Sequence, residues 1–79
     1  AYYYVADSGN HAIKRITVTT GDVTFLAGST AGVSGIVDGT GSAARFNSPT
    51  GLLMDPAGNV VVCDRDNHVI RSITPAGVV

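Results

Sequence analysis

Two histidines, His11 and His68, are the side chains in this sequence that could most directly ligate a metal ion. A zinc site needs three or four ligands that converge on one point, and the chain contains no third histidine. Both histidines stand at the end of the same Asp-x-x-Asn-His pattern, so they belong to different structural units. We therefore expect a structural role for both, with a hydrogen bond across a turn or packing on the next unit, and no metal site.

The carboxylates and hydroxyls do not form a catalytic or cation-binding set either. Asp7 and Asp64 occur once in each copy of the pattern, so their spacing is set by the repeat and not by a shared substrate. Asp38, Thr40 and Ser42 place oxygens on alternate residues, but an EF-hand calcium loop needs further acids and a terminal Glu. No Ser/His/Asp arrangement can be assembled, because the repeat already explains its members. The sequence thus predicts no catalytic residues and no cofactor-binding residues.

The single cysteine, Cys63, rules out a disulfide within the chain. It stands where the first copy of the pattern has Ala6, inside an apolar strand, and free cysteines in such positions are usually buried. We expect a buried, inert thiol.

An internal repeat organises these residues. A shift of 57 positions gives seven identities over the thirteen positions 5–17, with Lys14 and Arg71 as a further pair of like charge. The identical pairs are Val5/Val62, Asp7/Asp64, Asn10/Asn67, His11/His68, Ile13/Ile70, Ile16/Ile73 and Thr17/Thr74. Such a match indicates repeated structural units.

Each copy is typical of a β-hairpin, in which β-branched or aromatic residues precede and follow a polar turn. The first hairpin is expected at residues 2–6 and 11–17, followed by a third strand at 23–27. The second hairpin begins at residue 60. In both turns we expect the Asp side chain to accept backbone N–H groups and the Asn to take left-handed backbone.

The two hairpins are joined by a long segment rich in Gly, Ser and Thr. A connection of this length, residues 29–49, is usually either functional or disordered. Near its end, residues 42–46 are expected to form a short helical turn, with Phe46 anchoring the loop. Residues 50–54 predict an apolar strand buried on both faces, and residues 55–59 a turn with Pro56 second and Gly58 at positive φ.

Composition excludes several classes of partner. A net charge of −1 and the lack of a basic run argue against nucleic acid, and no apolar stretch reaches the roughly 18 residues needed to span a bilayer. No signal peptide is visible, although the chain starts at Ala1 and not at Met. The compartment stays open, with an extracellular or periplasmic location favoured. Seventy-nine residues give a marginal core, so the chain needs partners or is a piece of something larger.

Four segments together resemble the NHL-repeat family of β-propellers: residues 5–11, 38–52, 55–60 and 73–79. The resemblance implies blades of four antiparallel strands, of which this chain holds about one and a half. Residues 1–28 are expected to be part of one blade, residues 29–49 the inter-blade loop, and residues 50–79 the next blade. The family closes rings of about five to eight blades, so the remaining blades come from the same longer polypeptide or from further copies of the chain. The strand tally does not divide into whole blades, which favours the longer polypeptide.

The function expected from this resemblance is a non-catalytic scaffold that binds a protein or another ligand through the loop face of the propeller. The long loop and both hairpin turns are expected on that face, with an interaction surface made of Ser8, Asn10, Asp38, Arg45, Arg65, Asp66 and Asn67. Two alternatives stay open. One is a propeller enzyme, similar to the peptidyl-hydroxyglycine lyase or to a hydrolase, with metal in the central channel. The other is a structural propeller in an extracellular filament or surface layer.

Overall fold

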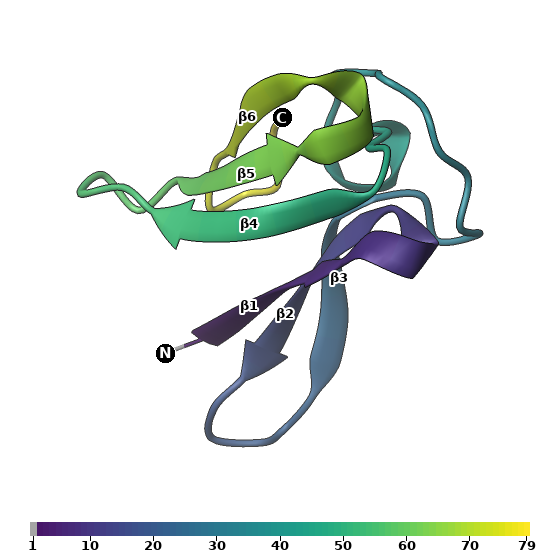
Figure 1. Ribbon diagram of the computed structural model, residues 1–79. Helices are drawn as coiled ribbons and strands as arrows, with labels where there is room; N and C mark the ends of the chain where they lie inside the picture. Colours follow the sequence, from purple (N-terminus) through teal and green to yellow (C-terminus); the bar gives the residue numbers. More distant parts are fainter. Residues whose placement is uncertain (1) are drawn as a thin grey trace.

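Two three-stranded antiparallel sheets make up the chain in its computed structural model, which describes residues 2–79 (Figure 1). The first sheet has the order β1-β2-β3 and the second β4-β5-β6. The strands are β1 (Tyr2–Asp7), β2 (Ala12–Thr17), β3 (Val23–Gly28), β4 (Pro49–Met54), β5 (Val60–Asp64) and β6 (Val69–Ile73). Three short 3-10 turns complete the elements: η1 (Ser8–Asn10), η2 (Gly41–Ala43) and η3 (Arg65–Asn67). The prediction of an all-β chain is confirmed.

The two hairpins share one register, as the repeat predicts. In each, the Asp of the pattern pairs with the residue that follows the His: Asp7 with Ala12, and Asp64 with Val69. The two Asp-x-x-Asn-His corners lie in separate sheets. A 57-residue shift therefore relates two structural copies, and positions in one copy can be compared directly with positions in the other.

The corners differ from their expected geometry. Each is a 3-10 turn followed by a histidine with left-handed backbone, at φ 56° for His11 and 57° for His68. The expectation that Asn would take this conformation is wrong. The histidine N–H instead closes the turn by donating to the carbonyl of Ser8 or of Arg65, and neither Asp caps its own turn with a side-chain hydrogen bond.

The apolar core lies between the two sheets. Its largest members are Ile13 of β2, Val60 and Val62 of β5, Ile73 of β6, and Phe46, which comes from the long connection and is fully buried. Burying a side chain of this kind contributes about 1.5–3 kcal/mol. The expected role of Phe46 as the anchor of the loop agrees with this burial.

Two burial predictions are wrong. The outer part of β4 is exposed, with Leu53 64% accessible, and Cys63 of β5 is also exposed. β4 is one of the two edge strands of its sheet, and Cys63 projects from the face of β5 opposite to the buried Val60 and Val62. The described residues 2–79 place nothing over these positions, so their apolar character does not translate into burial.

The connection from β3 to β4 is ordered and passes along the end of the molecule where both corners lie (Figure 1). Its backbone folds back on itself through a bridge between Val37 and Arg45, and Thr40 bridges to Val78. The expected helical turn at residues 42–46 occurs earlier, at Gly41–Ala43, because Ala44 is already extended (φ −74°, ψ 156°). The chain from residue 2 onward contains no helix long and apolar enough to cross a membrane.

Candidate interaction face

The long connection is held against both hairpin corners by hydrogen bonds. At the first corner, the Ser48 N–H donates to His11 Nδ1 at 3.0 Å and the Ser8 hydroxyl donates to the Pro49 carbonyl. At the second corner, the Asn67 side-chain amide donates to the Gly35 carbonyl at 2.8 Å. The structure therefore brings the loop and both corners to one face, as the sequence interpretation expected.

Arg71 of β6 is the centre of the contacts at the second corner. Its guanidinium donates to Asp64 Oδ2 at 3.1 Å, to Asp38 Oδ1 at 2.7 Å and to the Val37 carbonyl at 2.8 Å. A fourth bond reaches the Arg45 carbonyl, and the guanidinium lies 4.7 Å from the centre of the Phe46 ring. The planar fork of Arg suits this set of acceptors better than the point charge of Lys would. Arg71 thus binds the loop to the second sheet.

Asp64 completes the same network from a fully buried position. Besides Arg71, its carboxylate accepts the Asn47 N–H at 2.8 Å and the Asn67 side-chain amide at 2.7 Å. A buried charge is tolerated when it is both paired and hydrogen-bonded. The inferred structural role of Asp64 agrees with this geometry, although its N–H donor comes from the loop and not from its own turn.

The first corner carries the equivalent residues of Asp64, Asn67 and Arg71 in a more solvent-exposed position. Asp7 accepts the Asn10 side-chain amide at 2.9 Å and the Lys14 ammonium at 2.7 Å. The hydrogen bonds from Lys14 and then Asn10 lower the pKa of Asp7 below its usual range. Asp7 and Lys14 are 26% and 25% exposed, against 0% and 6% for Asp64 and Arg71. The repeat therefore places one ion pair near solvent and its counterpart in the interior.

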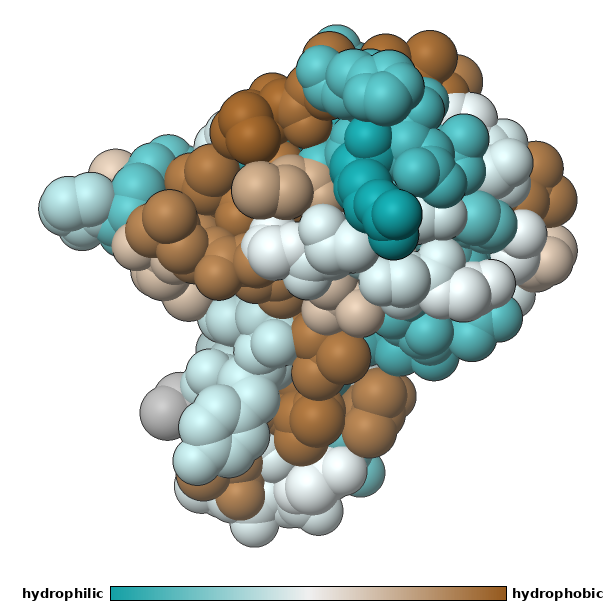
Figure 2. Space-filling view, viewed as in Figure 1, coloured by the Kyte–Doolittle hydropathy of each residue, from teal (hydrophilic) through white to brown (hydrophobic). Residues whose placement is uncertain are grey.

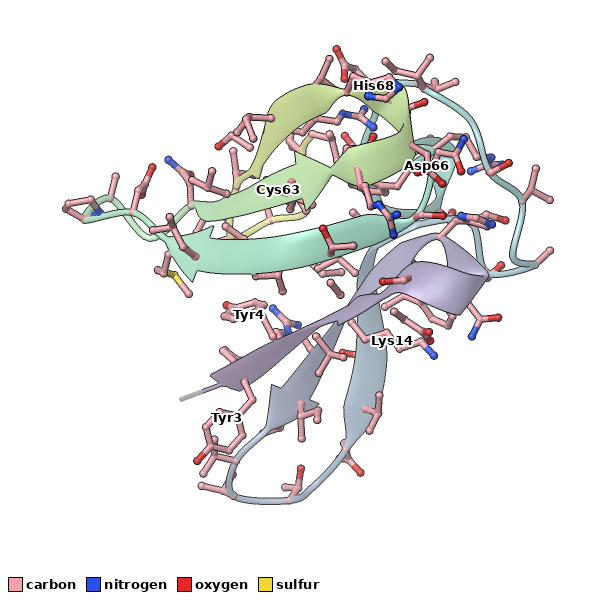
Figure 3. All side chains as sticks on the ribbon, in the orientation of Figure 1. Tyr3, Tyr4, Lys14, Cys63, Asp66 and His68 are labelled. Carbon is pink, nitrogen blue, oxygen red and sulfur yellow. The ribbon has the colours of Figure 1, made fainter. Side chains whose placement is uncertain are left out.

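The seven residues proposed for the interaction surface divide into two groups. Ser8, Arg45 and Asn67 use their side chains for bonds within the chain, Arg45 by donating to the Ser42 and Ala44 carbonyls. The exposed group comprises Asn10, Asp38, Arg65 and Asp66. In this group Asp38 is 81% exposed despite its bond to Arg71, and Arg65 and Asp66 are separated by 3.9 Å. Figure 3 shows Asp66 at the second corner. Whether any of the seven contacts a partner stays a prediction.

Arg71 is the residue of this network that sequence reasoning missed. The pairing of Lys14 with Arg71 in the repeat was the available signal, because a retained cation four residues after the Asn marks a defined partner. Among the described residues, no group of three or more His, Cys, Asp and Glu side chains could hold a metal ion. The Asp55 turn is a separate local structure, in which backbone and side-chain hydrogen bonds from Asn59 lower the pKa of Asp55.

Comparison with known proteins identifies the repeat. Residues 46–71 match the profile of a family described as "NHL repeat". The chain is 39% identical over 70 residues to Protein SUPPRESSOR OF QUENCHING 1, chloroplastic, of Arabidopsis thaliana. The aligned region covers 89% of this chain and 6% of that protein. It is 38% identical over 69 residues to human NHL repeat-containing protein 2, covering 86% of this chain and 9% of the relative.

A solved structure has the same fold over nearly the whole chain. It is described as an auxiliary nutrient binding protein from Bacteroides thetaiotaomicron, with a TM-score of 0.78 and 31% sequence identity. The match covers 98% of this chain and 21% of that one. This chain therefore spans a small part of each of these three proteins.

Proposed function

Since this chain belongs to the NHL-repeat family, we propose that it is a segment of a larger, non-catalytic β-propeller that serves as a protein-interaction or ligand-binding scaffold. Its relatives are much longer: the chain corresponds to 6% of one and 9% of another. The remaining blades of the ring then come from the rest of the same polypeptide.

The two sheets are proposed to be parts of successive four-stranded blades. Superposing the hairpins by the 57-residue shift places β4 before the common hairpin and β3 after it, which gives four antiparallel strands in sequence order. The chain then divides into a partial blade at residues 1–28, an inter-blade loop at 29–49 and a next blade at 50–79. Support for this division comes from the turn after each hairpin: the Thr74 N–H donates to the Val78 carbonyl at 2.9 Å, and its counterpart, the Thr17 N–H, donates to the carbonyl of Asp22, which lies one residue further along.

The observation that carries the scaffold proposal is the attachment of the loop at both corners. The loop backbone is fixed by a hydrogen bond that the Ser48 N–H donates to His11 and by hydrogen bonds that Asn67 and Arg71 donate to loop carbonyls. None of these bonds uses the side chains of Arg65 and Asp66. A rigid backbone that displays free polar side chains loses little entropy on binding. The exposed part of the interaction surface is therefore suited to contact a partner protein.

The test uses substitutions that the chain itself supplies. Arg65→Ser combined with Asp66→Gly converts the second corner to the sequence of the first, where the same backbone occurs with Ser8 and Gly9. Partners retained by the wild-type protein are purified, and their Kd for each variant is measured by calorimetry. We expect at least about tenfold weaker binding for the double variant, or about 1.4 kcal/mol. Thr19→Ala, in the exposed turn between β2 and β3, is the control and should bind with the affinity of the wild type. Equal affinity for the wild type and the double variant would remove the second corner from the interaction surface.

A small-molecule ligand is the second candidate, favoured by the structural similarity to the auxiliary nutrient binding protein. Its test is the thermal stability of the full-length protein with panels of saccharides, amino acids and vitamins. A ligand that raises Tm in proportion to the logarithm of its concentration would support this candidate. If no compound raises Tm, only the protein-binding form of the proposal remains.

A further inference from the structure

We propose that the outer side of the second hairpin corner is a preformed socket for the connecting segment of a further repeat, a segment with the chemistry of this chain's residues 46–49. The inference rests on one part of the proposed function, namely that the chain is a segment of a larger propeller and so has a neighbouring repeat. It is independent of what the loop face binds.

The socket is a shallow pocket of about 220 Å³. Its lining comes from β5, η3 and the start of β6, namely Cys63, Asp64, Arg65, His68, Val69 and Ile70. Figure 3 shows Cys63 and His68 on this sheet and at its corner, and Figure 2 shows hydrophobic side chains gathered over the same sheet beside hydrophilic ones. A lining that combines apolar and polar side chains is suited to an amphipathic peptide segment.

The equivalent positions of the first copy are already filled by the chain itself. A shift of 57 residues converts the pocket lining into Ala6, Asp7, Ser8, His11, Ala12 and Ile13. There the Ser48 N–H donates to His11 Nδ1 and the Ser8 hydroxyl donates to the Pro49 carbonyl. Ile13 lies in the same buried cluster as Phe46. The connecting segment is thus the natural occupant of this kind of pocket.

The two corners have the same backbone but opposite burial. Asp7 and Asp64 have φ/ψ of −87°/81° and −86°/80°, and His11 and His68 have 56°/44° and 57°/37°. Ile13 is fully buried, whereas its counterpart Ile70 is 67% exposed. The second socket therefore has the conformation of the occupied one without its occupant, so little reorganisation is needed on binding.

The lining defines the chemistry of the occupant. His68 Nδ1 offers an acceptor for a backbone N–H, and Arg65, in place of Ser8, offers donors for a carbonyl one residue later. Ile70 provides an apolar surface for an aromatic side chain. A second intact copy of this chain cannot supply the segment, because its own residues 46–49 lie between its two sheets, bonded to His11, Ser8 and Asp64.

A peptide provides the direct test. The probe is an acetylated and amidated peptide with the sequence of residues 42–50, and the readout is the rate at which Cys63, the only cysteine, is alkylated under native conditions. We expect saturable protection with a Kd on the order of 1 mM, since a free peptide must lose its backbone freedom on binding. Ile70→Thr should weaken the protection, and Val23→Thr, at another exposed apolar position, on β3, should leave it unchanged.

The same peptide with Ser in place of its Phe is the matched control and should give no protection. Equal protection by both peptides, or none at about 10 mM, would overturn the proposal. Because no partner of the loop face is present in the assay, failure here leaves the scaffold proposal standing.

A covalent version tests the socket without dependence on a weak peptide. Residues 23–79 are appended after Val79, which continues the 57-residue period, and the added cysteine is replaced by Ala. Alkylation of Cys63 should become slower by on the order of tenfold as the thiol is covered. Replacing the appended counterparts of Phe46 and Pro49 by Ser should restore the fast rate. An unchanged rate in a folded tandem chain would show that the next repeat does not use this socket.

Discussion

Replacement of Arg71 by Met should destabilise the chain far more than the equivalent replacement of Lys14. Arg71→Met leaves the buried Asp64 carboxylate without its counter-ion, and breaking a buried pair by removing one partner costs about 3–5 kcal/mol. Lys14→Met breaks a pair whose members are 25% and 26% exposed, which costs about 0–1 kcal/mol. A 79-residue chain has a free energy of unfolding of about 4–12 kcal/mol, so Arg71→Met removes a large share of it.

The assay is urea denaturation followed by far-UV circular dichroism. We expect the unfolding midpoint of Arg71→Met to fall steeply and that of Lys14→Met to move little, with the same dependence on urea for both. If Arg71→Met is too unstable to fold, Arg71→Lys, which keeps the charge and loses the fork of donors, should show an intermediate loss. Equal losses for Arg71→Met and Lys14→Met would refute the reasoning, because burial would then make no difference to the pair.

Three further predictions compare equivalent positions or depend on pH. His11→Asn should lower the free energy of unfolding by about 1 kcal/mol more than His68→Asn. Asn tolerates the left-handed backbone at both corners, and only His11 accepts the Ser48 N–H. Equal losses in urea denaturation would contradict this. In the isolated 79-residue chain, Ile13→Ala should cost about 2–5 kcal/mol and Ile70→Ala less than about 0.5, since only Ile13 is buried there; the same experiment checks both. Because the folded-state pKa values of Asp7 and Asp55 are depressed, their stabilising effect should be complete above about pH 4 and lost as the pH falls through those lower values. Urea midpoints measured from pH 6 to pH 2 should therefore decline less for Lys14→Met than for the wild type. An equal decline would exclude Lys14 as a cause of the lowered pKa of Asp7.

The strands and the anchoring aromatic could be predicted because their signals are local or periodic. Runs of β-branched and aromatic residues on either side of a polar turn marked the hairpins, and the 57-residue shift set them in one register. Phe46 stood out as the one large apolar side chain near the end of a Gly-rich segment. These features depend on the residues themselves and on their near neighbours.

The exposure of outer β4 and of Cys63 could not be predicted from the same signals. Apolar character shows that a position can be buried, but burial also requires a neighbouring surface, and the described residues 2–79 place none over Leu53 or Cys63. The predicted hairpin pairing was independent of this question and was correct.

The side-chain network was hidden for a different reason. Within turns the two-residue alternation of a strand is lost, so sequence alone does not tell whether a polar side chain points inward or outward. Ser8 and Asn67 point inward and Arg65 outward, although all three were placed on one surface. Arg71 reaches carbonyls of an irregular loop, and no sequence pattern marks which carbonyls these are.

The way the loop is attached has a consequence for how this protein can diverge. The attachment points are the carbonyls of Gly35, Val37 and Arg45 and the N–H groups of Asn47 and Ser48, and most of these contacts do not depend on the identity of the loop side chain. Residues 30–34, except Gly32 with its φ of 75°, lie between the buried Ser29 and the anchored Gly35 and can therefore change in sequence while the corners remain constant. Selection could alter recognition in that stretch without a matching loss of folding stability.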